Sequence, residues 1–127
     1  MQVEAATALQ RLRAIGDLPV IVPQVIYEYW VVATRPANQN GLGQDPMSTR
    51  QAVNEFIFIF LLLRDERGIF ARWLDIVSTN LVTGKSAHDA RLVAAMKRHG
   101  LTHIVTFNTQ DFARYNGITV LAPSSVP

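Results

Sequence analysis

The fold is decided by a short stretch near the carboxyl end of the chain, residues 102–112, whose sequence is THIVTFNTQDF. Its first part, Thr102–Phe107, is rich in β-branched and aromatic residues, which favour a buried strand. Its second part is polar and opens a helical turn that we expect at Thr109–Tyr115. In a parallel sheet, ligands bind beyond the carboxyl ends of the strands, so the polar residues of this stretch belong at such an edge.

Outward from this stretch, helical patterns alternate with short apolar runs, and Gly or Pro residues separate them. The helices that we expect are one with apolar positions from Ala6 to Ile15, then Pro23–Thr34, Thr49–Ile59 after a Ser48 cap, Ile69–Thr79 and Ala87–His99. The strands that we expect are Pro19–Val22, Phe60–Leu63, Thr102–Phe107 and Ile118–Leu121, with a loop over Ala37–Pro46. The strands are too uniformly apolar to have a wet face. They therefore predict a short parallel sheet with helices on both sides, a three-layer α/β/α sandwich in a single domain over residues 1–127.

Composition narrows the class of protein. With 127 residues, 49% apolar and 17% charged, the chain is one domain in length and has enough apolar residues for a core. It contains no cysteine, which excludes disulfides, zinc ribbons, iron–sulfur clusters and thiol nucleophiles. The longest apolar run, Phe56–Leu63, is too short for a membrane helix of about 20 residues. No secretory leader opens the chain, so we expect a cytoplasmic protein, and its net charge of +2 is compatible with nucleic acid.

Three carboxylates stand apart from the other charges. Glu28 lies within an apolar and aromatic helix, so it is either a half-exposed residue on a narrow polar stripe or a site residue. Asp89 follows Ser86 in an S-x-x-D pattern, which also fits a capping box. Asp111 follows Asn108 in the same way, with Asn108 as the cap. If these acids converge, they repel one another unless a cation is present, and oxygen ligands select a hard ion such as Mg²⁺ or Mn²⁺.

Basic residues could contact a phosphate, although a solvated surface explains them equally well. The candidates are Arg35 and Arg91, together with Lys85, Arg50 and Arg114. His88, beside Asp89, could also touch a substrate, although a surface histidine explains it better. No glycine-rich phosphate loop and no serine-nucleophile motif is present in the sequence.

Two segments of the second half resemble a known family. Residues 84–96, GKSAHDARLVAAM, and residues 103–112, HIVTFNTQDF, resemble PIN-domain ribonucleases, in particular the VapC-like toxins of type II toxin–antitoxin pairs. Residues 23–30, PQVIYEYW, with residues 32–36, VATRP, and 40–43, NGLG, resemble the second-helix region of the same family.

The resemblance implies a Mg²⁺- or Mn²⁺-dependent endoribonuclease, often a homodimer, that a small antitoxin protein holds inactive. In this sequence Glu28, Asp89 and Asp111 match three of the family's metal-binding acids, and Thr106 and Asn108 match its polar site positions. The chemistry that it implies is hydrolysis of an RNA phosphodiester by a cation-activated water, with no side chain as nucleophile.

The sequence departs from the family at its beginning, where the family has a strand that carries an Asp. Here Met1–Glu4 runs directly into the first helix, so that strand and its acid are missing. The start codon assigned too late, a truncated remnant, or a strand supplied by another chain would each explain this. The alternatives to a ribonuclease are therefore an impaired remnant that only binds antitoxin or RNA, and a small α/β domain whose acids are helix caps.

Overall fold

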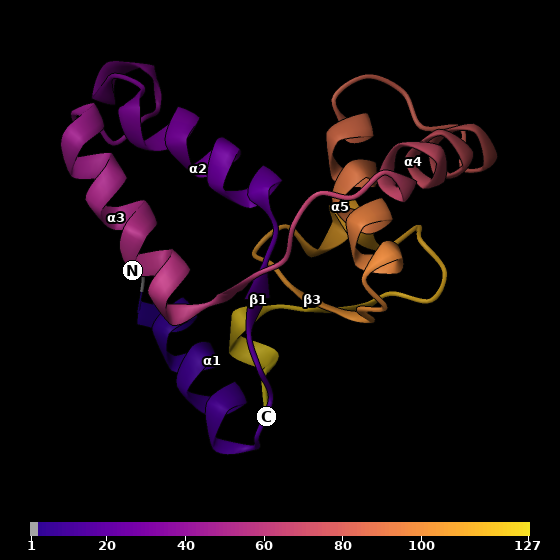
Figure 1. Cartoon of the computed structure of the whole chain (residues 1–127), viewed down its shortest axis with the longest axis horizontal. Coiled ribbons are helices and arrows are strands. Elements are labelled where there is room, and N and C mark those ends of the chain that lie inside the picture. Colours follow the sequence, from indigo (N-terminus) through magenta and orange to yellow (C-terminus); the bar gives the residue numbers. More distant parts are fainter. Residues whose placement is uncertain (1–2) are drawn as a thin grey trace. The chain divides into compact units, whose positions relative to one another are not determined.

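The computed structural model describes residues 3–127, and its contacts divide the chain into two compact units. The first unit comprises residues 3–17 and 65–127, and the second unit comprises residues 18–64. Within the described residues the fold is mixed α/β, with five α-helices and two separate two-stranded parallel sheets (Figure 1). Residues 1 and 2, on which part of the missing-strand expectation rests, lie outside the described range.

The first unit contains three helices, one sheet and two short 3₁₀ turns. Its elements are α1 (Val3–Ala14), α4 (Gly68–Thr79), α5 (Ser86–Arg98), β3 (His103–Val105), η2 (Thr109–Phe112), β4 (Thr119–Leu121) and η3 (Pro123–Ser125). β3 and β4 run parallel in the register His103↔Thr119 to Val105↔Leu121.

Helix α5 forms the centre of this unit's core because small and apolar residues recur along it. Ala90 and Val93 of α5 pack with Phe112 and Tyr115 in one buried cluster. The indole of Trp73 adds a polar anchor between two helices, since its Nε1–H of α4 donates to the Ala87 carbonyl of α5 at 2.8 Å. The start of α5 is thereby tied to the unit's apolar core.

The second unit is a helical hairpin with a short sheet. Its elements are β1 (Val20–Ile21), α2 (Pro23–Thr34), η1 (Ala37–Gln39), α3 (Pro46–Ile59) and β2 (Leu61–Leu62). The two strands are parallel, with Val20 opposite Leu61, and α2 and α3 pack side by side (Figure 1). The rings of Tyr29 and Phe56 meet edge to face, with 4.9 Å between their centroids.

Most of the predicted helices and strands are confirmed, but the start of one helix and the pairing of the strands differ from the prediction. Helix α3 begins at Pro46 rather than Thr49, because Asp45 is the cap: its carboxylate accepts from the Ser48 amide at 2.9 Å. The expectation that Ser48 itself is the cap is therefore wrong. The strands pair as two separate sheets, and Leu61 and Val105 keep exposed side chains. The arrangement as one sheet covered on both sides stays a prediction.

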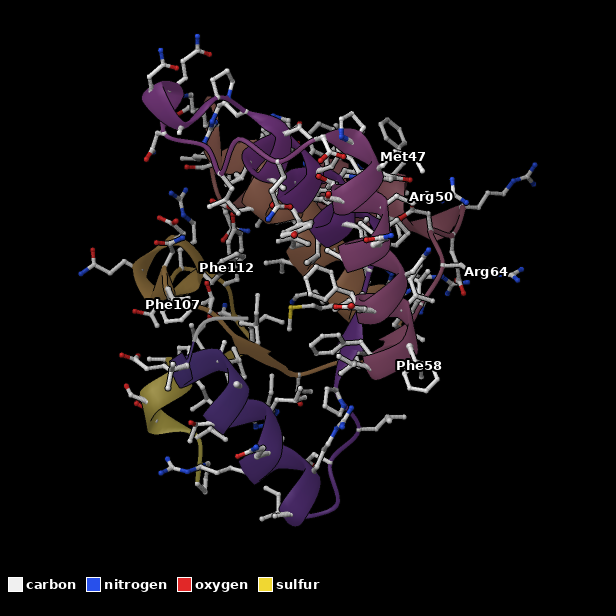
Figure 2. All side chains as sticks on the ribbon, turned by 90° about the vertical axis from the view of Figure 1, so that its left-hand side faces the viewer. Met47, Arg50, Phe58, Arg64, Phe107 and Phe112 are labelled. Carbon is white, nitrogen blue, oxygen red and sulfur yellow. The ribbon has the colours of Figure 1, made fainter. Side chains whose placement is uncertain are left out.

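Apolar side chains are also exposed along α3. Figure 2 shows Met47, Arg50 and Phe58 in succession on this helix, and the Phe58 side chain is 92% exposed. A hollow of about 320 Å³ beside Phe58 is lined by Asn54, Glu55 and Ile59, and it includes none of the predicted site acids. None of the helices in residues 3–127 combines the length and apolarity needed to cross a membrane.

Candidate functional site

The turn that follows β3 is held by three hydrogen bonds. The Thr106 amide donates to the Leu121 carbonyl at 2.9 Å, which extends the pairing of β3 and β4 by one residue. The Thr106 hydroxyl oxygen accepts from the Asn108 amide at 3.1 Å, and the Asp111 amide donates to the Asn108 carbonyl at 3.1 Å. Thr106, Asn108 and Asp111 are therefore fixed on one tight turn at the carboxyl end of a strand.

The side chains of this turn differ in exposure. Phe112 is buried, whereas Phe107, Asn108 and Asp111 are exposed (Figure 2 labels Phe107 and Phe112). The expectation that the Asn108 side chain caps the turn is wrong, since no side-chain cap hydrogen bond is formed there. The turn is instead closed by the Asp111–Asn108 backbone bond and by the Thr106 hydroxyl, and the Asn108 side chain is exposed.

Asp89 lies half-buried in the first turn of α5, where the helix dipole favours a negative charge. The expected capping box is wrong, because Ser86 is itself the first helical residue, and its N-cap Lys85 forms no side-chain cap hydrogen bond. The His88 amide already donates to the Lys85 carbonyl at 3.0 Å, so the helical turn begins before Ser86.

Asp89 and Asp111 lie on two segments that pack together. Ala90 directly follows Asp89 and Phe112 directly follows Asp111, and these two apolar residues belong to the same buried cluster. The packing of α5 against η2 thus joins the backbone segments that carry the two carboxylates.

Tyr115 is a polar residue of this region that sequence reasoning missed. Its side chain is 5% exposed, and its hydroxyl has no hydrogen-bond partner among the described residues. Burial raises the pKa of Tyr115, the nearby Arg114 guanidinium lowers it, and the negative charge of Asp89 raises it. The signal in the sequence is the spacing of Phe112 and Tyr115, three residues apart, which places both on the inner side of the turn.

Glu28 belongs to the second unit, unlike Asp89 and Asp111. It is exposed on α2, and its carboxylate accepts a hydrogen bond from the Gln24 side-chain amide at 3.1 Å. Of the two interpretations of its apolar setting, this exposure agrees with a polar stripe along the helix. No group of three or more His, Asp or Glu side chains within residues 3–127 is arranged to hold a metal ion.

The basic candidates have different settings. Arg35 closes the loop after α2, because its Nη2 donates to the Asn40 carbonyl at 2.9 Å. Arg91 reaches toward Asp65, with 3.8 Å between its Nη2 and the carboxylate, in a solvent-exposed pair of small energetic weight. His88 is exposed in the first turn of α5, one residue before Asp89. Of these three residues, His88 and Arg91 belong to the unit that carries the two aspartates.

Comparison with known proteins leaves the family open. No protein-family model matches the sequence, and none of the curated proteins is significantly similar to it.

Proposed function

We propose that this chain is a metal-dependent endoribonuclease, the toxin component of a toxin–antitoxin pair, with a three-layer PIN-like fold and a cytoplasmic location. The observation that supports the proposal best is the turn after β3, which fixes Thr106, Asn108 and Asp111 beside the helix that carries Asp89. This combination of carboxylates with a hydroxyl and an amide at the end of a parallel strand suits phosphodiester hydrolysis.

The donor set of the first unit fits Mg²⁺ or Mn²⁺ in part. Mg²⁺ and Mn²⁺ prefer hard oxygen ligands. The first unit offers the carboxylates of Asp89 and Asp111 and the side-chain carbonyl oxygen of Asn108. Mg²⁺ in nucleotide sites is bound through one or two carboxylates together with substrate phosphates, so the two aspartates of this unit match that number. When bound, the cation would polarise the scissile phosphate and activate a water molecule.

The chain's own residues would orient the substrate and the acids. The Thr106 hydroxyl accepts from the backbone N–H of Asn108, which helps to fix the main chain of the turn that carries Asn108 and Asp111. The exposed side-chain NH₂ group of Asn108 would donate to a phosphate oxygen or to the attacking water. His88 and Arg91, on the same helix as Asp89, would contribute positive charge to the RNA backbone.

A protein partner is part of the proposal. Exposed apolar side chains of α2 and α3, such as Val25, Val31 and Phe58, offer area for an antitoxin or for a second copy of the chain in a homodimer. The same exposed side chains favour the second candidate function, a non-catalytic protein that binds antitoxin or RNA without cleaving it.

The test is RNA cleavage by the purified chain in Mn²⁺, Mg²⁺ or EDTA, with Asp111→Ala as the site variant. Asp75→Ala is the matched control, because Asp75 is an exposed acid on α4 of the same unit. We expect cleavage that requires the cation, survives in Asp75→Ala and is lost in Asp111→Ala. Binding of RNA without cleavage, by a folded chain, would refute the ribonuclease and favour the non-catalytic binding protein.

A further inference from the structure

The Tyr115 hydroxyl is an unusual group in the core of the first unit. Buried polar atoms are nearly always hydrogen-bonded, so each exception in a folded protein calls for a physical explanation. Tyr115 is 5% exposed, its hydroxyl oxygen is inaccessible to solvent, and no described residue accepts its proton or donates to it. A phenylalanine at this position would fill the same space without leaving a polar group unsatisfied.

The surroundings of Tyr115 connect it to one site residue. Its ring packs in the cluster that contains Ala90 and Val93 of α5, so it lies against the turn of the helix that carries Asp89. The negative charge of Asp89 also contributes to raising the pKa of the Tyr115 phenol. The Arg114 guanidinium carbon lies 6.0 Å from the centroid of the Tyr115 ring. The ring of Tyr115, with its unpartnered hydroxyl, is therefore packed against the part of α5 in which Asp89 directly precedes Ala90.

We propose that Tyr115 is a positioning residue for Asp89, and that its hydroxyl donates a hydrogen bond to the Asp89 carboxylate, directly or through one water, when that carboxylate binds a divalent cation. The inference rests on the proposed function and adds to it a residue of this chain to which the sequence motifs assign no role. A carboxylate that binds a cation through one oxygen leaves the other oxygen to be satisfied by a neighbouring donor. Such donors orient the ligand and strengthen metal binding.

Two readouts separate this role from simple core packing. If Tyr115 only fills the core, Tyr115→Phe removes an unsatisfied hydroxyl, so it leaves the melting temperature unchanged or raises it and does not affect cation binding. If Tyr115 positions Asp89, the same variant weakens cation binding without loss of stability. Only the second interpretation moves the affinity for the metal.

The experiment is calorimetric titration of the full chain with Mn²⁺ alone, together with a thermal melt of each variant. We expect Tyr115→Phe to bind Mn²⁺ about tenfold more weakly than the natural chain, the lower end of the range for outer-shell partners. Tyr27→Phe is the matched control, since it removes an exposed hydroxyl on α2 and should keep the natural affinity. Asp89→Ala should abolish Mn²⁺ binding.

The outcomes distinguish the inference from the function on which it rests. If the natural chain binds Mn²⁺, Asp89→Ala abolishes binding and Tyr115→Phe binds as tightly as the natural chain, the positioning role is refuted while the metal site stands. If the natural chain does not bind Mn²⁺ at all, both the inference and the proposed metal site are refuted.

Discussion

Replacing Gly41 by alanine should destabilise the second unit strongly, because the loop after α2 leaves no space for a side chain there. A Cβ built on Gly41 would lie 2.6 Å from the Arg35 Cβ and closer still to the Arg35 carbonyl oxygen. Carbon atoms in contact prefer about 3.5–4.0 Å, so the backbone would have to move by about 1 Å. The obstacle is mostly main chain, which has no rotamer through which it can give way.

The cost follows from the hydrogen bonds of that loop. Four backbone bonds return it to the end of α2 and the residues that follow: Gly41 N–H to Pro36 at 3.1 Å, Leu42 N–H to Val32 at 3.0 Å, Gly43 N–H to Arg35 at 2.9 Å and Gln44 N–H to Ala33 at 2.8 Å. Each is worth about 1 kcal/mol net. Moving Gly41 away from Arg35 breaks two to four of them, so the free energy of unfolding should fall by about 2–4 kcal/mol. That is a large share of a typical total of about 5–15 kcal/mol.

Gly43 of the same loop supplies the matched control. Its φ is +64°, but a Cβ there would meet only Ala37 atoms at 3.7 and 3.9 Å, which is ordinary contact. Gly43→Ala should therefore cost only the left-handed conformation, about 1 kcal/mol. Urea denaturation followed by far-ultraviolet circular dichroism measures both variants. A Gly41→Ala chain that is as stable as Gly43→Ala, or more so, would refute the reasoning.

Three further changes have a direction set by the structure. Leu81 has φ +53° after α4, so Leu81→Gly should stabilise the chain by about 1 kcal/mol and raise the melting temperature by about 3–5 °C; a lower melting temperature would contradict this. Trp73→Phe deletes the donor to the Ala87 carbonyl and should cost about 1–3 kcal/mol in urea denaturation, whereas an unchanged midpoint would show that the bond is dispensable. Burial raises the pKa of Tyr115 above its ordinary value of 10.0 in the folded chain. Above pH 10.0 the Tyr115 hydroxyl therefore ionises first in the unfolded chain, and the free energy of unfolding falls with rising pH until the folded pKa is reached. Melting curves from pH 9 to about 11 should show a smaller loss for Tyr115→Phe than for the natural chain.

Local signals in the sequence were sufficient for most helices and strands. Pro23 predicts the first residue of a helix and Pro36 its end, and α2 spans Pro23–Thr34 as expected. The division of the apolar run 56–63 into a helix end and a strand is also confirmed, since α3 ends at Ile59 and β2 is Leu61–Leu62. Parallel pairing follows from strands separated by helices, because such crossovers bring strands back in the same direction.

The caps and the site depended on contacts that the sequence does not encode locally. The sequence predicted Ser48 as the cap of α3, whereas the structure has Asp45, because only the path of the chain decides which side chain reaches a free amide. Likewise the sequence offers Asp89 and Asp111 as separate helix-start acids, whereas the packing of Ala90 with Phe112 joins their segments.

By itself, the sequence determined the order and type of the elements and the parallel direction of the strands. It also placed Thr106, Asn108 and Asp111 on one turn. These features depend mostly on residues within a few positions of one another. The tertiary structure alone decided that strands pair as β1 with β2 and β3 with β4, that Glu28 is exposed on α2, and that the Tyr115 hydroxyl is buried near the helix of Asp89. Each of these depends on side chains distant in sequence competing for the same buried volume, and no local pattern records the outcome of that competition.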